Sequence, residues 1–63
     1  AEGLAHFRRL EREARGLLRS GAVLLVELDP RNIEAAEKLC GSWAARGIES
    51  DLAGRRRFLV LQR

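Results

Sequence analysis

The chain has 63 residues, a net charge of +3 and a pI near 10.4. Its single cysteine excludes an internal disulfide, and without a second thiol or a histidine cluster we expect no metal site. The longest apolar run is far shorter than the roughly 20 residues of a membrane-spanning helix, so the sequence predicts neither a membrane span nor an export signal. A chain of about 60 residues buries only about 60% of its unfolded surface, which makes its stability marginal.

The positive charge comes from arginine used almost without lysine, Lys38 being the one lysine. This charge is compatible with a nucleic acid or an acidic partner. Because nine carboxylates are interspersed among the basic residues, the charge alone does not decide between partners.

The first predicted element is a helix over residues 3–19. Its apolar stripe recurs at helical spacing and comprises Leu4, Phe7, Leu10, Ala14, Leu17 and Leu18. Arginines lie on nearly the opposite side: Arg8, Arg12, Arg15 and Arg19. Ser20-Gly21 ends the helix, with Gly21 supplying a left-handed turn.

A strand over residues 22–28 follows, and then a second helix from Asp29-Pro30 to about residue 46. Asp29 is suited to cap this helix and Pro30 to begin it. We expect Gly47 to end it. Its predicted buried face comprises Ile33, Ala36, Leu39, Cys40, Trp43 and Ala44.

A short polar strand over 48–52, a turn over 53–56 and an apolar strand over 57–62 complete the order helix, strand, helix, strand, strand. The polar strand is typical of a sheet edge. The last strand should pair antiparallel with it and lie between the other two, since a right-handed crossover leaves a gap there. The far side of strand 22–28 is then an open edge.

Strands 22–28 and 57–62 are aliphatic without polar alternation, which is typical of strands covered on both faces in α/β proteins. Two short helices cannot cover both faces of this sheet. We therefore expect residues 1–63 to be one part of a larger α/β domain, and the start at Ala1 without an initiator methionine is consistent with such a piece.

Several segments resemble bacterial release-factor glutamine methyltransferases, a family of class I S-adenosylmethionine-dependent methyltransferases. Residues 3–10 and 17–28 resemble the family's "GLxFYRRL…LLRPGGxLLLEL" segment. Residues 32–39 resemble its following helix, and Gly47-Ile48 its "GF" before the sixth strand. Residues 51–57, Asp-Leu-Ala-Gly-Arg-Arg-Arg, are similar to its closing "DLAGxxR".

The resemblance implies the C-terminal portion of a Rossmann-like methyltransferase sheet with an antiparallel last strand. It implies a parent enzyme, cytoplasmic, that uses S-adenosylmethionine to methylate a glutamine side-chain amide of a peptide-chain release factor. The family's cofactor loop and its Asn-Pro-Pro-Tyr segment do not occur here, so no catalytic or cofactor-binding residue carries over. We expect this chain alone to be an inactive scaffold that binds no cofactor, with the remainder of the methyltransferase domain as its partner.

Four residues are candidates for contact with a substrate or partner: Glu27, Arg55, Arg56 and Arg57. Glu27 ends strand 22–28, and open α/β sheets bind ligands at the carboxyl ends of their strands. The alternative for Glu27 is a solvated or paired carboxylate. The arginines form a turn of like charges that is suited to RNA, ribosome or an acidic protein surface.

Two further interpretations stay open. A small basic RNA- or ribosome-binding module would use the arginine stripe, but Phe58 is the only strand aromatic available to stack on a base. Nucleic acid is therefore the less favoured partner. The other open interpretation is a structural module that self-associates through the open edge of strand 22–28. Cys40 is expected to be a packed thiol and His6 an exposed residue of helix one.

Overall fold

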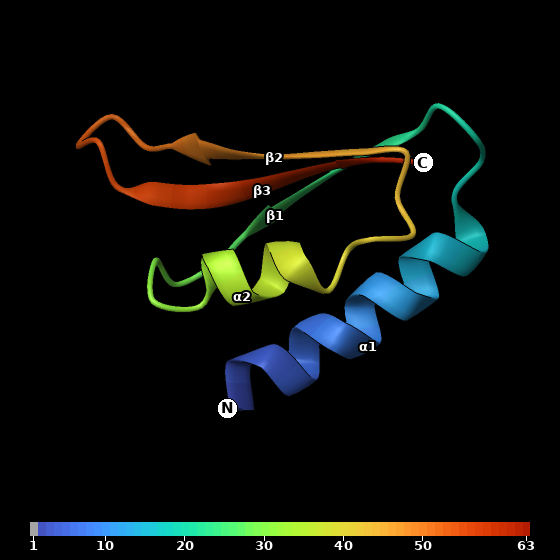
Figure 1. Ribbon diagram of the computed structural model, residues 1–63, viewed down its shortest axis with the longest axis horizontal. Coiled ribbons are helices and arrows are strands. Elements are labelled where there is room, and N and C mark those ends of the chain that lie inside the picture. The colour runs from blue at the N-terminus through green and yellow to red at the C-terminus, as the bar shows by residue number, and fades with distance from the viewer. Residues whose placement is uncertain (1) are drawn as a thin grey trace.

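A computed structural model describes residues 2–63, with side chains from residue 4 onward. The elements are α1 (Glu2–Leu17), β1 (Val23–Glu27), α2 (Ile33–Lys38), β2 (Ala45–Ser50) and β3 (Arg56–Gln62). Both helices lie on the same side of a three-stranded sheet (Figure 1). This confirms the predicted order of helices and strands. Neither of the described helices has the length and apolar character needed to cross a bilayer.

The strand order in the sheet is β1-β3-β2, and β3 is antiparallel to both neighbours. The predicted insertion of the last strand between its predecessors is confirmed. Since β1 and β2 both oppose β3, they run in the same direction. Their carboxyl ends, at Glu27 and Ser50, therefore lie at the same end of the sheet, and the β2–β3 turn projects beyond this end (Figure 1). We call residues 27–31 and 51–57 the carboxyl edge.

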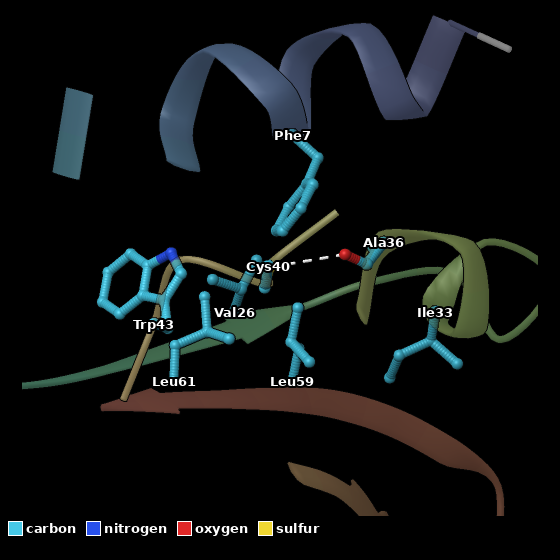
Figure 2. Close-up of a cluster of buried hydrophobic side chains, with 8 residues drawn as sticks. All are labelled: Phe7, Val26, Ile33, Ala36, Cys40, Trp43, Leu59 and Leu61. Atoms are coloured by element: carbon cyan, nitrogen blue, oxygen red, sulfur yellow. Dashed lines mark hydrogen bonds between the residues drawn. The ribbon is translucent and has the colours of Figure 1, made fainter. Parts of the chain in front are cut away.

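The core lies between the sheet and the two helices (Figure 2). Among the residues whose side chains are described, eight buried ones form this core: Phe7, Val26, Ile33, Ala36, Cys40, Trp43, Leu59 and Leu61. The Cys40 thiol donates a hydrogen bond of 3.3 Å to the Ala36 carbonyl. Trp43 and Cys40 are core residues, as the sequence predicted.

The predicted second helix is wrong at both ends, and only its part from Ile33 to Lys38 is helical. α2 begins after Asn32 and ends at Lys38, whereas the sequence predicted a helix from Asp29-Pro30 to about residue 46. Residues 39–44 form turns and bends. Gly47 does not end a helix but lies within β2, where it pairs with Val60 of β3. The edge strand is therefore 45–50, where 48–52 was expected. Leu39 and Ala44 are exposed, because the helix that would have buried them is absent.

The first helix also differs in its buried face. α1 ends at Leu17, and the predicted stripe residues Leu10 and Leu17 are exposed. Glu11 is buried instead, with 7% of its surface accessible. The buried face is thus rotated toward Phe7 and Glu11, and Leu4, Ala14 and Leu18 pack at the margin of the core. Gly21 has a φ of 89°, which confirms the left-handed turn after the helix.

One face of the sheet is open among the residues that the structure describes. Val23 and Leu25 of β1 are 62% and 61% exposed, while Val26 of the same strand is buried. Cross-strand pairing places Val23 beside Gln62 and Leu25 beside Val60 on this face. The sequence led us to expect cover on both faces, and this chain supplies it on one only. We call this surface, built around Val23, Leu25 and Val60, the open face.

Candidate functional site

The carboxyl edge holds all four residues that the sequence singled out. Arg57 lies at its centre because two carboxylates approach the same guanidinium group. Its Nη1 atom is 3.5 Å from Oε2 of Glu27, and its Nε atom is 3.3 Å from Oδ2 of Asp51. The Nε approach satisfies the distance of an ion pair but not the geometry of a hydrogen bond. Glu27 is thus paired with Arg57, which agrees with the paired alternative for its role.

The other two arginines of the turn are paired as well. The Nε atom of Arg55 is 3.4 Å from Oδ2 of Asp51, and Arg56 reaches across to Glu34 of α2. The three consecutive positive charges therefore each face a carboxylate. This pairing leaves little net positive charge at the edge for binding a phosphate backbone.

Asp51 organises the β2–β3 turn. Its Oδ1 atom accepts hydrogen bonds of 2.9 Å from the backbone N–H groups of both Ala53 and Arg55. The Asp51 N–H donates to the Arg55 carbonyl at 2.8 Å, and the Gly54 N–H donates to the Asp51 carbonyl at 3.0 Å. The hydrogen bond from the Arg55 N–H is the main reason why the pKa of Asp51 lies below its usual value. The turn is therefore fixed by its own hydrogen bonds.

The predicted helix cap at Asp29 is wrong. Oδ1 of Asp29 accepts a hydrogen bond of 2.9 Å from the Arg31 backbone N–H, so the side chain stabilises the turn before α2. The Arg31 side chain also donates to this carboxylate, with Nη2 2.9 Å from Oδ2. These bonds, the side-chain bond first, lower the pKa of Asp29 to about 2. Asn32 occupies the N-cap position of α2 without a side-chain capping bond.

A polar cluster that the sequence did not reveal lies at the margin of the core. Oε2 of Glu11 accepts hydrogen bonds from Nε1 of Trp43 at 2.8 Å and from Nε of Arg15 at 2.7 Å. Burial raises the pKa of Glu11, but the two hydrogen bonds outweigh it and the net pKa is lowered. Glu11 ties α1 to the connection before β2. The signal available in the sequence was Trp43, because a buried indole N–H needs an acceptor.

The remaining candidates show no catalytic arrangement. Burial is the main cause that raises the pKa of Cys40 to about 11, which keeps this thiol protonated and unreactive. His6 is exposed, as expected. No group of three metal-ligating side chains occurs in the described part of the chain. Of the predicted arginine stripe, Arg15 is engaged by Glu11, Arg8 and Arg12 are exposed on α1, and Arg19 is exposed beyond the end of the helix.

The far side of β1 presents unpaired backbone groups. Hydrogen bonds from Arg63 N–H to Ala22 (2.9 Å) and from Leu28 N–H to Arg57 (2.8 Å) show that even-numbered residues of this segment face β3. Antiparallel pairing alternates, so the N–H and C=O groups of Val23, Leu25 and Glu27 point to the opposite side. Among residues 2–63 no strand occupies that side. β1 therefore has an open edge, as predicted, that is able to pair with another strand.

The open face carries a shallow hollow of about 350 Å³ between β1 and β2. Its lining is apolar at Val23, Ala45, Gly47, Ile48 and Val60 and polar at Arg46, Glu49 and Gln62. An aliphatic surface of this kind is suited to packing against another apolar element. The open edge and the open face adjoin each other along β1.

The chain is similar to the release factor glutamine methyltransferase of Deinococcus radiodurans. The two sequences are 44% identical over 64 residues, which cover 98% of this chain and 23% of that relative, as a C-terminal match. The chain thus spans about a quarter of the length of the relative. No family model and no solved structure matches it. The resemblance read from the sequence is confirmed over nearly the whole chain.

Proposed function

We propose that this chain is the closing, sheet-completing segment of an S-adenosylmethionine-dependent methyltransferase that methylates a glutamine side-chain amide of a peptide-chain release factor. The observation that carries the proposal is the open edge and open face of β1, combined with 44% identity to a relative about four times as long. An unpaired strand edge beside an aliphatic face is a liability in an isolated protein. In a completed sheet it becomes the joining surface.

In this proposal the chain acts as scaffold within a Rossmann-like catalytic domain. A strand from the rest of the enzyme pairs with Val23, Leu25 and Glu27, and helices from the same part cover the open face. Leu25 and Val60 then become core residues. Both partners, the rest of the domain and the release factor, are proposed to meet this chain in the cytoplasm.

The described residues do not themselves fit S-adenosylmethionine. The hollow on the open face is mainly aliphatic, and the carboxylates of the carboxyl edge are engaged by arginines. A ligand with a charged amino acid group and a ribose needs unengaged polar partners in a concave site. We therefore assign the cofactor to the part of the enzyme outside this chain, and no residue here to catalysis. Glu27 remains a substrate-side candidate through its position at the carboxyl edge.

At the carboxyl edge, the pairing of charges disfavours the alternative of an RNA- or ribosome-binding module, whereas Arg8, Arg12 and Arg19 of the predicted arginine stripe remain exposed. Arg55, Arg56 and Arg57 all face carboxylates, and each phosphate contact would have to displace one of them. Self-association through the open edge is a further possibility for the isolated chain, because the same backbone groups would pair with a second copy. In the proposed enzyme that edge is occupied.

A chimera tests the proposal. The matched 64-residue segment of the Deinococcus radiodurans enzyme is replaced by this chain, and methyl transfer to an intact release factor is followed by mass spectrometry. We expect one methyl group to be added at a glutamine. The relative truncated before the matched segment is the negative control and should be inactive. An inactive chimera that nevertheless folds and binds S-adenosylmethionine would contradict the proposal.

A further inference from the structure

We propose that the groove between α1 and α2 binds an acidic, amphipathic segment of a separate partner protein. The two helices lie side by side on one side of the sheet (Figure 1). Between them is a hollow of about 440 Å³, lined by Leu4, Ala5, Arg8, Ala35 and Leu39. The groove is distinct from the carboxyl edge and from the open face, so this inference goes beyond the proposed function.

Cations without a carboxylate partner lie on the α1 side of this groove. Arg8 and Arg12 are exposed and one helical turn apart, about 6 Å along the axis of α1. No ion pair of the described residues includes either arginine, whereas Arg9 and Arg15 of the same helix each pair with a glutamate four residues away. Guanidinium groups bind carboxylates through charge-assisted hydrogen bonds. The α1 side therefore attracts an anion that the described residues do not supply.

The α2 side of the groove is apolar, with no carboxylate among the described residues that line it. Ala35 and Leu39 are four residues apart and so share the flank of α2 that faces α1. Leu39 keeps 39% of its surface exposed. Glu34 is engaged by Arg56, and Glu37 lies about 200° around the helix from Ala35. The hollow can thus take an apolar side chain beside the arginines without meeting a negative charge.

The opposite flank of α1 faces the remainder of the proposed enzyme. A helix turns about 100° per residue, so Leu10 and Leu17, both exposed, lie roughly opposite Arg8 around α1. Leu10 lines another hollow, of about 310 Å³, together with Val26 of β1 and Leu28 just after it. Because α2 packs on β2 and β3, this leucine flank faces away from α2 and toward the open edge of β1. The elements that we propose to join at β1 adjoin the leucine flank and leave the arginine flank at the surface.

An apolar hollow beside cations selects an acidic protein segment over RNA or a lone anion. RNA would use the cations, but its bases need stacking aromatics, and the described lining of the groove has none. A lone phosphate or carboxylate would leave the apolar hollow empty. A short amphipathic helix with one aliphatic side chain between carboxylates fills the hollow and faces both arginines.

Calorimetry with a synthetic peptide tests the inference on the 63-residue chain. The probe is a helical peptide with one leucine flanked by glutamates at helical spacing. One control peptide has alanine for the leucine, and we expect it to bind about 10-fold or more weakly, which corresponds to the loss of leucine burial. The other has glutamine for each glutamate and should bind about 5-fold or more weakly. A probe that does not bind, or that binds no better than both controls, overturns the proposal.

Variants of the chain locate the site. Arg8→Gln and Arg12→Gln remove the proposed contacts, and Arg9→Gln is the matched control, because Arg9 is an exposed arginine of the same helix that is paired with Glu13. We expect R8Q combined with R12Q to raise the Kd of the probe about 5-fold or more, and R9Q to leave it unchanged. Ala35→Leu fills the hollow, keeps the charges and should also weaken binding. Equal effects of R8Q and R9Q would place the peptide elsewhere and contradict the proposal.

The chimera shows whether the groove stays free in the larger enzyme. We expect it to bind the probe with the same Kd as the chain. A chimera that binds S-adenosylmethionine but not the probe would mean that the rest of the enzyme covers the groove, which overturns the proposal. Binding of oligouridine that weakens steeply with salt and is lost in R8Q also overturns it, because the partner would then be RNA. A chimera that binds the probe but transfers no methyl group refutes the enzyme and leaves this inference standing.

Discussion

Glu11 shows how one buried carboxylate fixes the position of a helix. Its Oε2 atom receives the Trp43 indole N–H and the Arg15 guanidinium, so that α1 is bonded to a connection 32 residues away in sequence. A buried carboxylate without such donors would destabilise the fold by several kcal/mol. With both donors in place it is satisfied and orients the two elements relative to each other.

Replacing Glu11 with Gln tests this role. Glutamine keeps the shape but removes the charge from two hydrogen bonds, and we expect the free energy of unfolding to fall by about 1.5–3 kcal/mol. Glu13→Gln is the matched control, because Glu13 forms an exposed i,i+4 pair with Arg9 and should change stability by less than about 0.5 kcal/mol. Urea unfolding measures both. Equal effects of the two variants would contradict the assigned role of Glu11.

The same residue predicts a pH dependence. The folded pKa of Glu11 lies below its usual value of 4.5, so its contribution to stability is present above that value and is lost as the pH falls through the folded pKa. Asp29 and Asp51, also with lowered pKa values, contribute in the same direction. Unfolding measured between pH 7 and pH 2 should show stability falling on acidification. The fall should be smaller in E11Q than in E13Q, and parallel curves would count against the Glu11 contribution.

At the scale of elements, the sequence correctly predicted that Cys40 and Trp43 are buried, but it wrongly placed them in the second helix. Cys40 and Trp43 continue the helical spacing of Ile33 and Ala36, and this regularity led to a helix of more than two further turns. Gly41 and Ser42 have poor helix propensity and interrupt it. The chain then gains hydrogen bonds by starting β2 early, with the Ala44 N–H donating to the Gln62 carbonyl at 2.8 Å. Long-range pairing of this kind leaves no periodic signal in the local sequence.

Two glycines permit a matched test of the elements that contain them. Neither Gly16 in α1 nor Gly54 in the β2–β3 turn has an atom within 4 Å of an added Cβ, so only backbone conformation distinguishes them. Gly54→Ala should destabilise the chain by about 1–2 kcal/mol, because φ is 83° there. Gly16→Ala should stabilise it by up to about 1 kcal/mol through helix propensity. Thermal unfolding decides, and a destabilising G16A or a neutral G54A would contradict the expectation.

At the scale of the molecule, the strand order and the open edge were predictable because they follow from apolar patterning and connection rules. The carboxyl-edge candidates were predictable only in part. The position of Glu27 at a strand end follows from the pattern, but its pairing with Arg57, 30 residues later, depends on the register between β1 and β3. Register is fixed by side-chain packing across the whole sheet. The pairing of Arg56 with Glu34, 22 residues earlier, depends on tertiary packing as well, whereas the pairing of Arg55 with Asp51 is local to the turn.

The open face predicts that the effect of a substitution depends on what surrounds the chain. Leu25 is 61% exposed, so Leu25→Lys should leave the stability of the isolated chain within about 0.5 kcal/mol and reduce its self-association. In the chimera, the same change places an unpaired charge in the proposed core and should abolish folding. Leu59→Ala, at a side chain buried within this chain, should cost about 2–5 kcal/mol in both settings.

Sedimentation and urea unfolding of both proteins measure these effects. A chimera that tolerates L25K as well as the isolated chain does would show that nothing packs on the open face, and the scaffold role would then be lost. The contrast with L59A is essential. It distinguishes the open face, which other parts of the enzyme would cover, from the core that this chain forms by itself. The context dependence of Leu25, and not the stability of either protein alone, is therefore the property that identifies the chain as part of a larger sheet.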